Sequence, residues 1–213
     1  MIEKNEPILP SKVVISKGIT IAFLGPDGSG KSTIIDQLIK EKLPFKQHDY
    51  FHLKPIVSKG NSENVVTNPH EEKEYSTIKS ILKLFFFMYQ YNSGWVKNIK
   101  ELKKKKSLII FDRYYDDLLV DNKRYRYGAS IKLAKFFRVL IPRPELYFIL
   151  TAAPSVIYSR KQEVPFTELE RQVKGYRALA DGKRYFSMDV NREPKDIVKD
   201  IVKIIIEHTN EYR

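Results

Sequence analysis

The chain has 213 residues, of which 42% are hydrophobic and 30% are charged, and this balance indicates one globular domain and excludes a disordered chain. It contains no cysteine, which excludes disulfides and thiolate metal sites and suits a cytoplasmic protein. The formal net charge of +12 favours an anionic partner, and nucleic acid, an anionic membrane surface and phosphorylated metabolites all qualify.

The N-terminus and the longest apolar run indicate whether the chain carries a signal peptide or a membrane-spanning segment. Residues 1–17 lack the continuous apolar core of a signal peptide, and the run 84–89 is too short to span a bilayer. We therefore expect a soluble protein with an N-terminal arm at residues 1–17 and a single domain at 18–213. The lysine run 103–106 is interpreted as a solvated helix end or turn before a strand, and no nucleic-acid motif accompanies it, so no specific nucleic acid is expected.

Apolar runs and helical periodicity alternate along the chain. Strands are predicted at residues 19–24, 48–53, 108–111, 146–150 and 185–190. Helices are predicted at residues 32–42, 78–95, 131–140, 154–160 and 166–179 and from Pro194 onward, with a loop at 57–72. The helix at 78–95 is apolar almost all round, which predicts a buried helix with a break near Gly94. Five strands separated by helices predict an α/β fold with a parallel sheet covered on both faces.

A glycine-rich segment follows the first predicted strand. Residues 25–32 read Gly-Pro-Asp-Gly-Ser-Gly-Lys-Ser and match the phosphate-binding P-loop between a strand and a helix. Glycines let successive N–H groups point at one cluster of phosphate oxygens, and the helix N-terminus adds partial positive charge. The predicted nucleotide-binding residues are Gly25, Asp27, Gly28, Ser29, Gly30, Lys31, Ser32 and Thr33. Lys31 is predicted to reach the β- and γ-phosphates of ATP, and the Ser32 hydroxyl to ligate Mg²⁺.

Asp112 and Arg113 follow the third predicted strand. A carboxylate at the tip of a buried strand in a P-loop protein is the expected place for a group that holds Mg²⁺ through water. A guanidinium beside it can grip an acceptor phosphate with two hydrogen bonds. The alternative is an Asp–Arg pair on the surface.

Cations gather in the two helices that follow the fourth strand, at Arg160, Lys161 and Arg171. On a hinged pair of helices they could close over a transferring phosphoryl group. Solvated charges on helix faces are an equally good interpretation.

Together these motifs resemble those of the thymidylate kinase family of nucleoside monophosphate kinases. The resemblance rests on residues 25–33, on Asp112-Arg113-Tyr114 and on the helix 172–179. It implies a three-layer P-loop sandwich with five parallel strands in the order 2-3-1-4-5, and ATP with Mg²⁺. It also implies that Asp27 contacts the acceptor sugar hydroxyl, that Asp112 is linked to magnesium, and that Arg113 binds the acceptor phosphate.

The position of the catalytic arginine varies within that family. Some members carry it in the P-loop and others in the lid, and Ser29 occupies the P-loop position here. The resemblance therefore places the lid at about residues 158–172. Arg160 is the first candidate for its catalytic cation, and Lys161 and Arg171 are the next candidates. The expected partner is a small-molecule phosphate acceptor, and a homodimer is left open.

The chain departs from the family pattern around the acceptor. Residues 52–55 read His-Leu-Lys-Pro where many members have Arg-Glu-Pro-Gly-Gly, and Asn122 stands at the position of a base-reading glutamine. The lid lacks a second arginine motif, and 121–127 is either a solvated helix end or an altered acceptor site. An acid at Asp27 also needs a partner, whether a sugar hydroxyl, metal-bound water or a cation such as Arg113.

The sequence thus predicts phosphoryl transfer from ATP to a nucleoside monophosphate, with thymidylate first (dTMP + ATP to dTDP + ADP). Two alternatives stay open. One is a kinase for a sugar or glycan acceptor in surface-polysaccharide assembly, and the other is a non-catalytic nucleotide-binding regulator.

Overall fold

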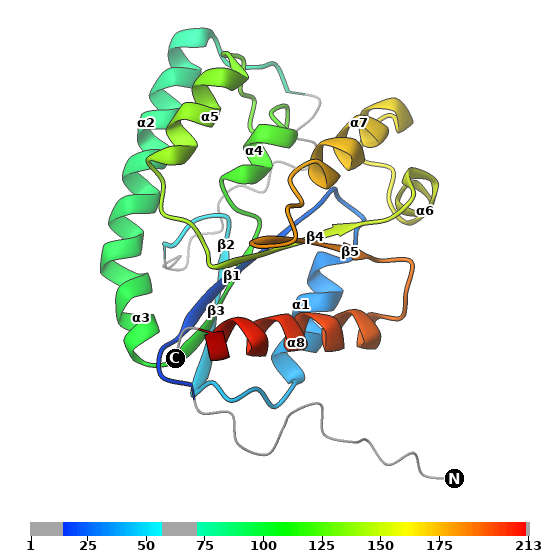
Figure 1. The fold of residues 1–213 in the computed structure, drawn as a ribbon. Coiled ribbons are helices and arrows are strands. Elements are labelled where there is room, and N and C mark those ends of the chain that lie inside the picture. Colours follow the sequence, from blue (N-terminus) through cyan, green and yellow to red (C-terminus); the bar gives the residue numbers. More distant parts are fainter. Residues whose placement is uncertain (1–14, 57–71, 212–213) are drawn as a thin grey trace.

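The computed structural model describes residues 15–56 and 72–211 (Figure 1). Most of the predicted arm and almost all of the predicted loop at 57–72 lie outside these residues. The strands are β1 (Ile19–Leu24), β2 (Gln47–His52), β3 (Ser107–Asp112), β4 (Leu146–Thr151) and β5 (Tyr185–Asp189). The helices are α1 (Lys31–Lys40), α2 (Thr77–Gly94), α3 (Lys100–Lys104), α4 (Asp116–Val120), α5 (Ile131–Val139), α6 (Pro154–Arg160), α7 (Phe166–Arg177) and α8 (Pro194–Glu211), with a π-helical segment η1 (Trp95–Ile99) between α2 and α3.

The five strands form one parallel sheet in the order β2-β3-β1-β4-β5. Helices α1 and α8 cover one face, and α2, α3 and α5 cover the other (Figure 1). The predicted three-layer α/β fold and its strand order are therefore confirmed. Because parallel strands need crossover connections, every strand is reached through at least one helix or long segment.

Alternation along the central strands builds the two halves of the core. In β1, Ile21 and Phe23 pack with α1 and α8, whereas Ala22 and Leu24 face the opposite cluster that holds α2 and α5. All six residues of β1 are buried, which is the signature of a strand covered on both faces. The core consequently fixes the carboxyl end of β1, where the P-loop begins.

The helix predicted at 78–95 differs from expectation in two ways. It does not break near Gly94, because η1 and α3 continue the same helical path. Gly94 instead permits a close approach, since a Cβ there would lie 2.3 Å from the Pro55 carbonyl oxygen. The prediction of burial was also wrong in part. Large apolar side chains on one side of this helix are exposed, namely Ile78, Leu82, Phe85, Phe86, Tyr89 and Val96.

The other boundaries lie within a few residues of the prediction. The lysine run 103–106 ends α3 and forms the turn into β3, as predicted. The short helix α4 was not predicted. Within the described residues, no helix combines the length and the apolar character that crossing a membrane requires.

Candidate active site

Three P-loop glycines occupy backbone conformations that other residues rarely adopt. Gly25, Gly28 and Gly30 have φ values of 146°, 81° and 82°. A Cβ at Gly25 would lie 2.4 Å from the Leu150 carbonyl oxygen, and one at Gly28 would lie 2.9 Å from Cβ of Lys161. Gly30 is the N-cap of α1, so the loop delivers its N–H groups to the start of that helix.

Lys31 is buried at the first position of α1, with 7% of its surface exposed. Its Nζ donates to the carbonyl oxygens of Gly25 and Pro26, at 2.8 and 2.9 Å. Burial, and then the nearby Arg113 charge, lowers the pKa of Lys31 to about 7. A bound phosphate would supply the negative charge that these neutral carbonyls do not.

Asp112 ends β3 directly beside β1, where it pairs in register with Phe23. The Tyr50 hydroxyl donates to Oδ2 of Asp112 at 3.1 Å, while Oδ1 is buried and has no hydrogen-bond partner among the described residues. Asp112 and the exposed Ser32 line the same cleft. No group of three acidic or histidine side chains in the described residues could hold a metal alone. A hydroxyl, one free carboxylate oxygen and substrate phosphates nevertheless fit the oxygen ligands that Mg²⁺ prefers.

Arg113 is also buried, so the alternative of an Asp–Arg surface pair is wrong. Its guanidinium contacts two carboxylates, Asp27 through Nη2 and Asp117 through Nη1. Asp117 is fully buried and also accepts hydrogen bonds from the hydroxyls of Tyr125 and Tyr176, at 3.2 and 2.6 Å. Although burial opposes its charge, the pKa of Arg113 is raised well above the ordinary value, because Asp117 lies beside it. Its φ of 71° is strained for a non-glycine residue, which is typical of a functional position.

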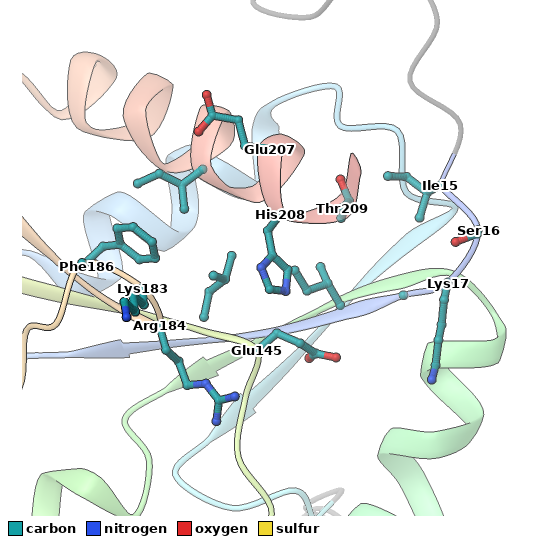
Figure 2. Close-up of a pocket in the computed structure, with 15 residues that line it drawn as sticks. Ile15, Ser16, Lys17, Glu145, Lys183, Arg184, Phe186, Glu207, His208 and Thr209 are labelled. Carbon is teal, nitrogen blue, oxygen red and sulfur yellow. The ribbon is translucent and has the colours of Figure 1, made fainter. Parts of the chain in front are cut away.

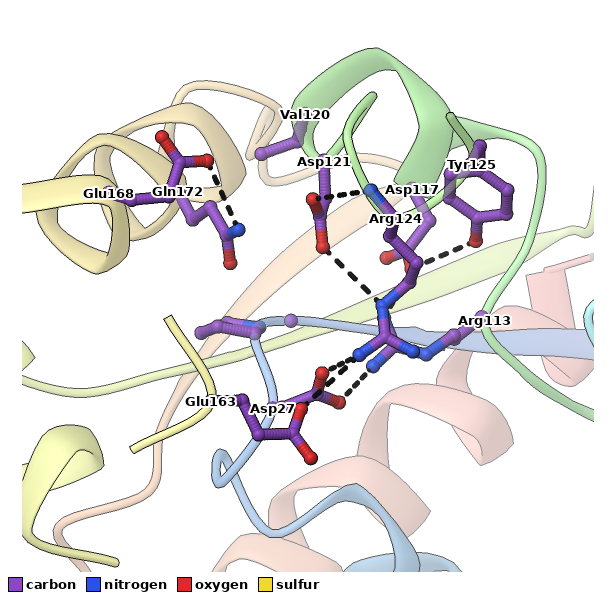
Figure 3. Close-up of polar contacts among 12 residues, drawn as sticks. Asp27, Arg113, Asp117, Val120, Asp121, Arg124, Tyr125, Glu163, Glu168 and Gln172 are labelled. Carbon is purple, nitrogen blue, oxygen red and sulfur yellow. Dashed lines mark hydrogen bonds and ion pairs between the residues drawn. The ribbon is translucent and has the colours of Figure 1, made fainter. Parts of the chain in front are cut away.

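The segment 121–127 is not a solvated helix end. Asp121, Tyr125 and Tyr127 are buried, and Arg124 contacts Asp27 beside Arg113 (Figure 3). Burial, and then the nearby Asp117 charge, raises the pKa of Asp121 to about 7. Asp27 is compensated by Arg113, which is one of the three kinds of partner considered from the sequence, and also by Arg124, which the sequence did not single out.

The predicted lid cations separate into two groups. Arg160 and Lys161 line the cleft opposite the P-loop, and Arg160 Nη2 donates to the Val190 carbonyl oxygen at 3.0 Å. Arg171 does not line it, because its guanidinium is held by Glu168 and by the Val120 carbonyl oxygen. The structure therefore favours the first two as groups that face a bound nucleotide.

The cleft has a volume of about 740 Å³ and lies at the carboxyl ends of the strands, where ligands of open α/β sheets bind. It brings together every predicted site residue except Gly25, which lies behind it against β4, and the lid candidate Arg171. Among further lining residues, His52 belongs to the segment that departs from the family pattern, whereas Arg124 and residues 190–194 were not predicted. Position was an available signal for residues 190–194, because β5 ends at the same edge of the sheet, but not for Arg124, which follows α4.

A second cavity, of about 900 Å³, lies at the opposite end of the molecule, between the start of β4 and the end of α8 (Figure 2). Glu145 projects there, but Thr20 and Lys103 already occupy its carboxylate. His208 faces the same space. Because no P-loop residue reaches it, this cavity is not the candidate active site.

The P-loop, the buried carboxylate of Asp112 on the neighbouring strand β3 and the cations Arg160 and Lys161 at the end of α6 line one cleft, as in a P-loop phosphotransferase. The sequence model of the family described as thymidylate kinase matches residues 23–201. The chain belongs to the thymidylate kinase family, and is thus an ATP-dependent kinase of the nucleoside monophosphate kinase class.

Individual relatives agree with this membership. The chain is 27% identical to a probable thymidylate kinase of Methanosarcina barkeri, over 90% of this chain and 97% of the relative. Its fold is similar to the crystal structure of thymidylate kinase from Ehrlichia chaffeensis, with a TM-score of 0.60, 20% identity and coverage of 88% and 98% of the two chains. It is also similar to thymidylate kinase from Candida albicans, with a TM-score of 0.62, 19% identity and coverage of 91% and 93%.

Proposed function

We propose that this protein transfers the γ-phosphoryl group of ATP to the phosphate of a nucleoside monophosphate, with thymidylate as the first acceptor to test. The observation that carries the proposal is the cleft itself. Donor-side groups, Lys31 and Ser32, and acceptor-side groups, Asp27 and Arg113, line one cavity together with Asp112. This arrangement supports in-line transfer, in which positioning and charge stabilisation supply most of the catalysis.

Each residue has a role that follows from its position. The P-loop N–H groups bind the ATP phosphates, and Lys31 leaves its carbonyl partners to follow the charge on the γ-phosphoryl group. An oxygen of the acceptor phosphate forms the new bond to the γ-phosphorus as the bond to the β,γ-bridging oxygen breaks, giving ADP. Arg160 and Lys161, on the facing side of the cleft, stabilise the charge spread over the transferring group. The segment 158–172 is the proposed lid.

Ser32 and Asp112 are the residues that would hold Mg²⁺. The unpartnered Oδ1 of Asp112 supports this assignment, because a buried carboxylate oxygen without a donor requires another source of positive charge. When bound, the ion would neutralise charge on the β- and γ-phosphates. Tyr50 holds the other oxygen of Asp112 and so orients the carboxylate.

Asp27 and the family support thymidylate as the first acceptor, since the resemblance assigns this acid to the sugar hydroxyl of the acceptor. The family match and the kinase relatives do not favour the sugar-acceptor or regulator alternatives.

The direct test measures ADP release and the phosphorylated product with Mg·ATP and a panel of acceptors. The panel contains thymidylate, the other nucleoside monophosphates and simple sugars, each at millimolar concentration. Formation of dTDP with ADP in equal amounts is the expected result. Turnover of a sugar without turnover of any nucleoside monophosphate would refute the proposal.

A further inference from the structure

Arg124 is a second guanidinium on the acceptor side of the cleft. It lies after α4, in the segment that departs from the family pattern, and lines the same cavity as Lys31 and Arg160. Its Nη2 contacts Oδ2 of Asp27, while Arg113 contacts Oδ1 of that carboxylate (Figure 3). Two arginines that are separate in the sequence therefore meet on one carboxylate, with one oxygen for each guanidinium.

The surroundings hold Arg124 in place without exhausting its donors. Asp121 lies 3.4 Å from Nε and accepts from the Arg124 backbone N–H at 3.3 Å, and Glu163 lies 3.4 Å from Nη2. Nε is buried, yet it has no hydrogen-bond partner within the described residues. Its nearest acceptor is the Asp121 carboxylate at 3.4 Å, so no full set of hydrogen bonds fixes the guanidinium in its present place.

The chemistry of this arrangement is that of an anion clamp. Planar guanidinium groups match the oxygens of carboxylate and phosphate, and two of them facing one anion give both charge and direction. In the ligand-free protein Asp27 occupies that place. A phosphate dianion has more charge and more oxygens than a carboxylate, and can therefore take contacts from both arginines.

We propose that Arg124 binds the phosphate of the acceptor together with Arg113, so that the two form a clamp that Asp27 occupies before the acceptor arrives. This rests on the proposed phosphoryl transfer and names the residue that recognises the acceptor's anionic group. Arg124 also links this group to the lid, because Glu163 lies between α6 and α7 and contacts both Arg124 and Lys161, the latter at 2.5 Å.

The test measures binding of inorganic phosphate to protein saturated with Mg²⁺ and a non-hydrolysable ATP analogue, which keeps phosphate out of the donor site. Wild type is compared with Arg124→Ala, Arg124→Lys and Arg126→Ala, at constant ionic strength, by the thermal shift at increasing phosphate. Arg126→Ala is the matched control, because Arg126 is on the same loop but contacts Glu72 and the Tyr75 ring instead of the cleft.

We expect Arg124→Ala to weaken phosphate binding at least about tenfold, the loss of a charge-assisted hydrogen bond, with Arg124→Lys intermediate and Arg126→Ala close to wild type. Equal phosphate affinity in Arg124→Ala and Arg126→Ala would overturn the clamp. A wild-type protein that does not bind phosphate would overturn it as well.

Two further readouts separate the clamp from a structural latch and from the proposed function. In the thymidylate assay, Arg124→Ala should raise the KM for thymidylate while the KM for ATP stays unchanged. Glu163→Gln should keep or tighten phosphate binding, whereas a latch role predicts the same loss as in Arg124→Ala. If wild type does not phosphorylate thymidylate, the proposed acceptor fails, and the phosphate titration still decides the role of Arg124.

Discussion

Lys31 and Arg113 are both buried cations of the cleft, yet they are held by different groups. Lys31 donates to two neutral carbonyls, whereas Arg113 contacts two carboxylates. Burial, and then the nearby Arg113 charge, lowers the pKa of Lys31 to about 7, whereas the Asp117 charge raises that of Arg113 although burial opposes it. When a phosphate binds, Lys31 exchanges neutral carbonyl partners for a negatively charged one. Arg113, by contrast, must exchange a carboxylate for a phosphate. Replacing Lys31 and replacing Arg113 should therefore change different kinetic parameters.

Lys31→Ala should lower turnover by about 10³-fold or more, because it removes the donor that follows the developing charge on the transferring group. The melting temperature should change by only about 2–4 °C, since no apolar cavity opens. Lys40→Ala, at the exposed last turn of the same helix, is the control. Steady-state kinetics and thermal unfolding measure both effects, and wild-type turnover in Lys31→Ala would end the kinase proposal.

Asp112→Asn and Arg113→Ala should separate the metal and acceptor roles. Asp112→Asn is expected to raise the Mg²⁺ concentration needed for half-maximal rate, because it removes charge from the unpartnered oxygen. Arg113→Ala is expected to raise the KM of the acceptor and to lower kcat. Kinetics with each of the three components varied in turn give the result. If both variants altered only the affinity for ATP, the division of roles would be wrong.

Asp121→Asn should change how stability depends on pH. The folded-state pKa of Asp121 is raised to about 7, so the folded protein binds more protons than the unfolded chain between about pH 4 and 7, and stability falls as the pH rises. The uncharged amide removes this effect. We expect the unfolding free energy of Asp121→Asn to exceed that of wild type by on the order of 2 kcal/mol at pH 8. At pH 5 the difference should be less than half as large.

Urea unfolding of both proteins at the two pH values measures this difference. The charged neighbours of Asp121, which are Asp117, Arg113, Glu168 and Arg124, are present in both proteins, so the comparison changes only the charge at position 121. An equal gain at both pH values would show that packing, and not ionisation, separates them.

At the scale of elements, α7, which carries the second half of the proposed lid, packs on the end of α4. Gly175 faces Val120, and a Cβ at Gly175 would lie 2.8 Å from Cγ1 of Val120. Arg171, one turn earlier on α7, donates to the Val120 carbonyl oxygen at 2.9 Å. Helix α7 thus packs on α4, the helix that precedes the loop of Arg124. These two contacts with Val120 connect the proposed lid with the acceptor side of the cleft.

Gly175→Ala should destabilise the protein by about 1–2 kcal/mol, because overpacking against Val120 outweighs the better helix propensity of alanine. Val120→Ala removes the clashing methyl group, so the double variant should recover part of the loss. A double-mutant cycle from denaturant unfolding gives the coupling. A more stable Gly175→Ala protein with no coupling to Val120 would contradict this packing.

At the scale of the whole molecule, an apolar surface lies on the outer side of the helical layer. Six exposed residues of α2 and η1 form part of it, and Phe136, Val139 and Leu140 add to it from α5 and the residue that follows. The α2 positions recur at spacings of three, four and seven, which places them on one helix face. Exposed apolar patches of this kind mark interaction surfaces. A second copy needs only this one face, because a two-fold contact uses the same surface twice.

We therefore expect a dimer of about twice 25.0 kDa in light scattering after size exclusion. Phe86→Asp should give the monomer, since it brings like charges together across the two-fold axis. Phe166→Asp is the control, because Phe166 is an exposed aromatic residue on α7. A monomeric wild-type protein at all concentrations would reject this interface.

The sequence by itself determined the features that depend on local pattern. The glycine spacing of 25–32 predicted the P-loop, because only glycine tolerates the positive φ angles that curl the backbone around phosphate. Continuous apolar runs predicted β1, β3 and β4, because a strand covered on both faces leaves no position for polar side chains. Asp112 and Arg113 were found for the same reason, since they follow such a run at the edge where ligands bind.

Only the tertiary structure decided what surrounds these residues. The contact between Asp27 and Arg113 spans 86 positions of sequence, and the one between Asp27 and Arg124 is no more local. Periodicity reports which face of an element is apolar, but not what covers that face. Hence α2 was predicted to be buried although one side is exposed. The segment 121–127 was open to a solvated interpretation, although Asp121, Tyr125 and Tyr127 are buried and Arg124 is paired with Asp27. The local sequence around a charged residue does not indicate which residue it pairs with. Only the fold, which brings Arg124 to Asp27, shows that Arg124 lines the cleft.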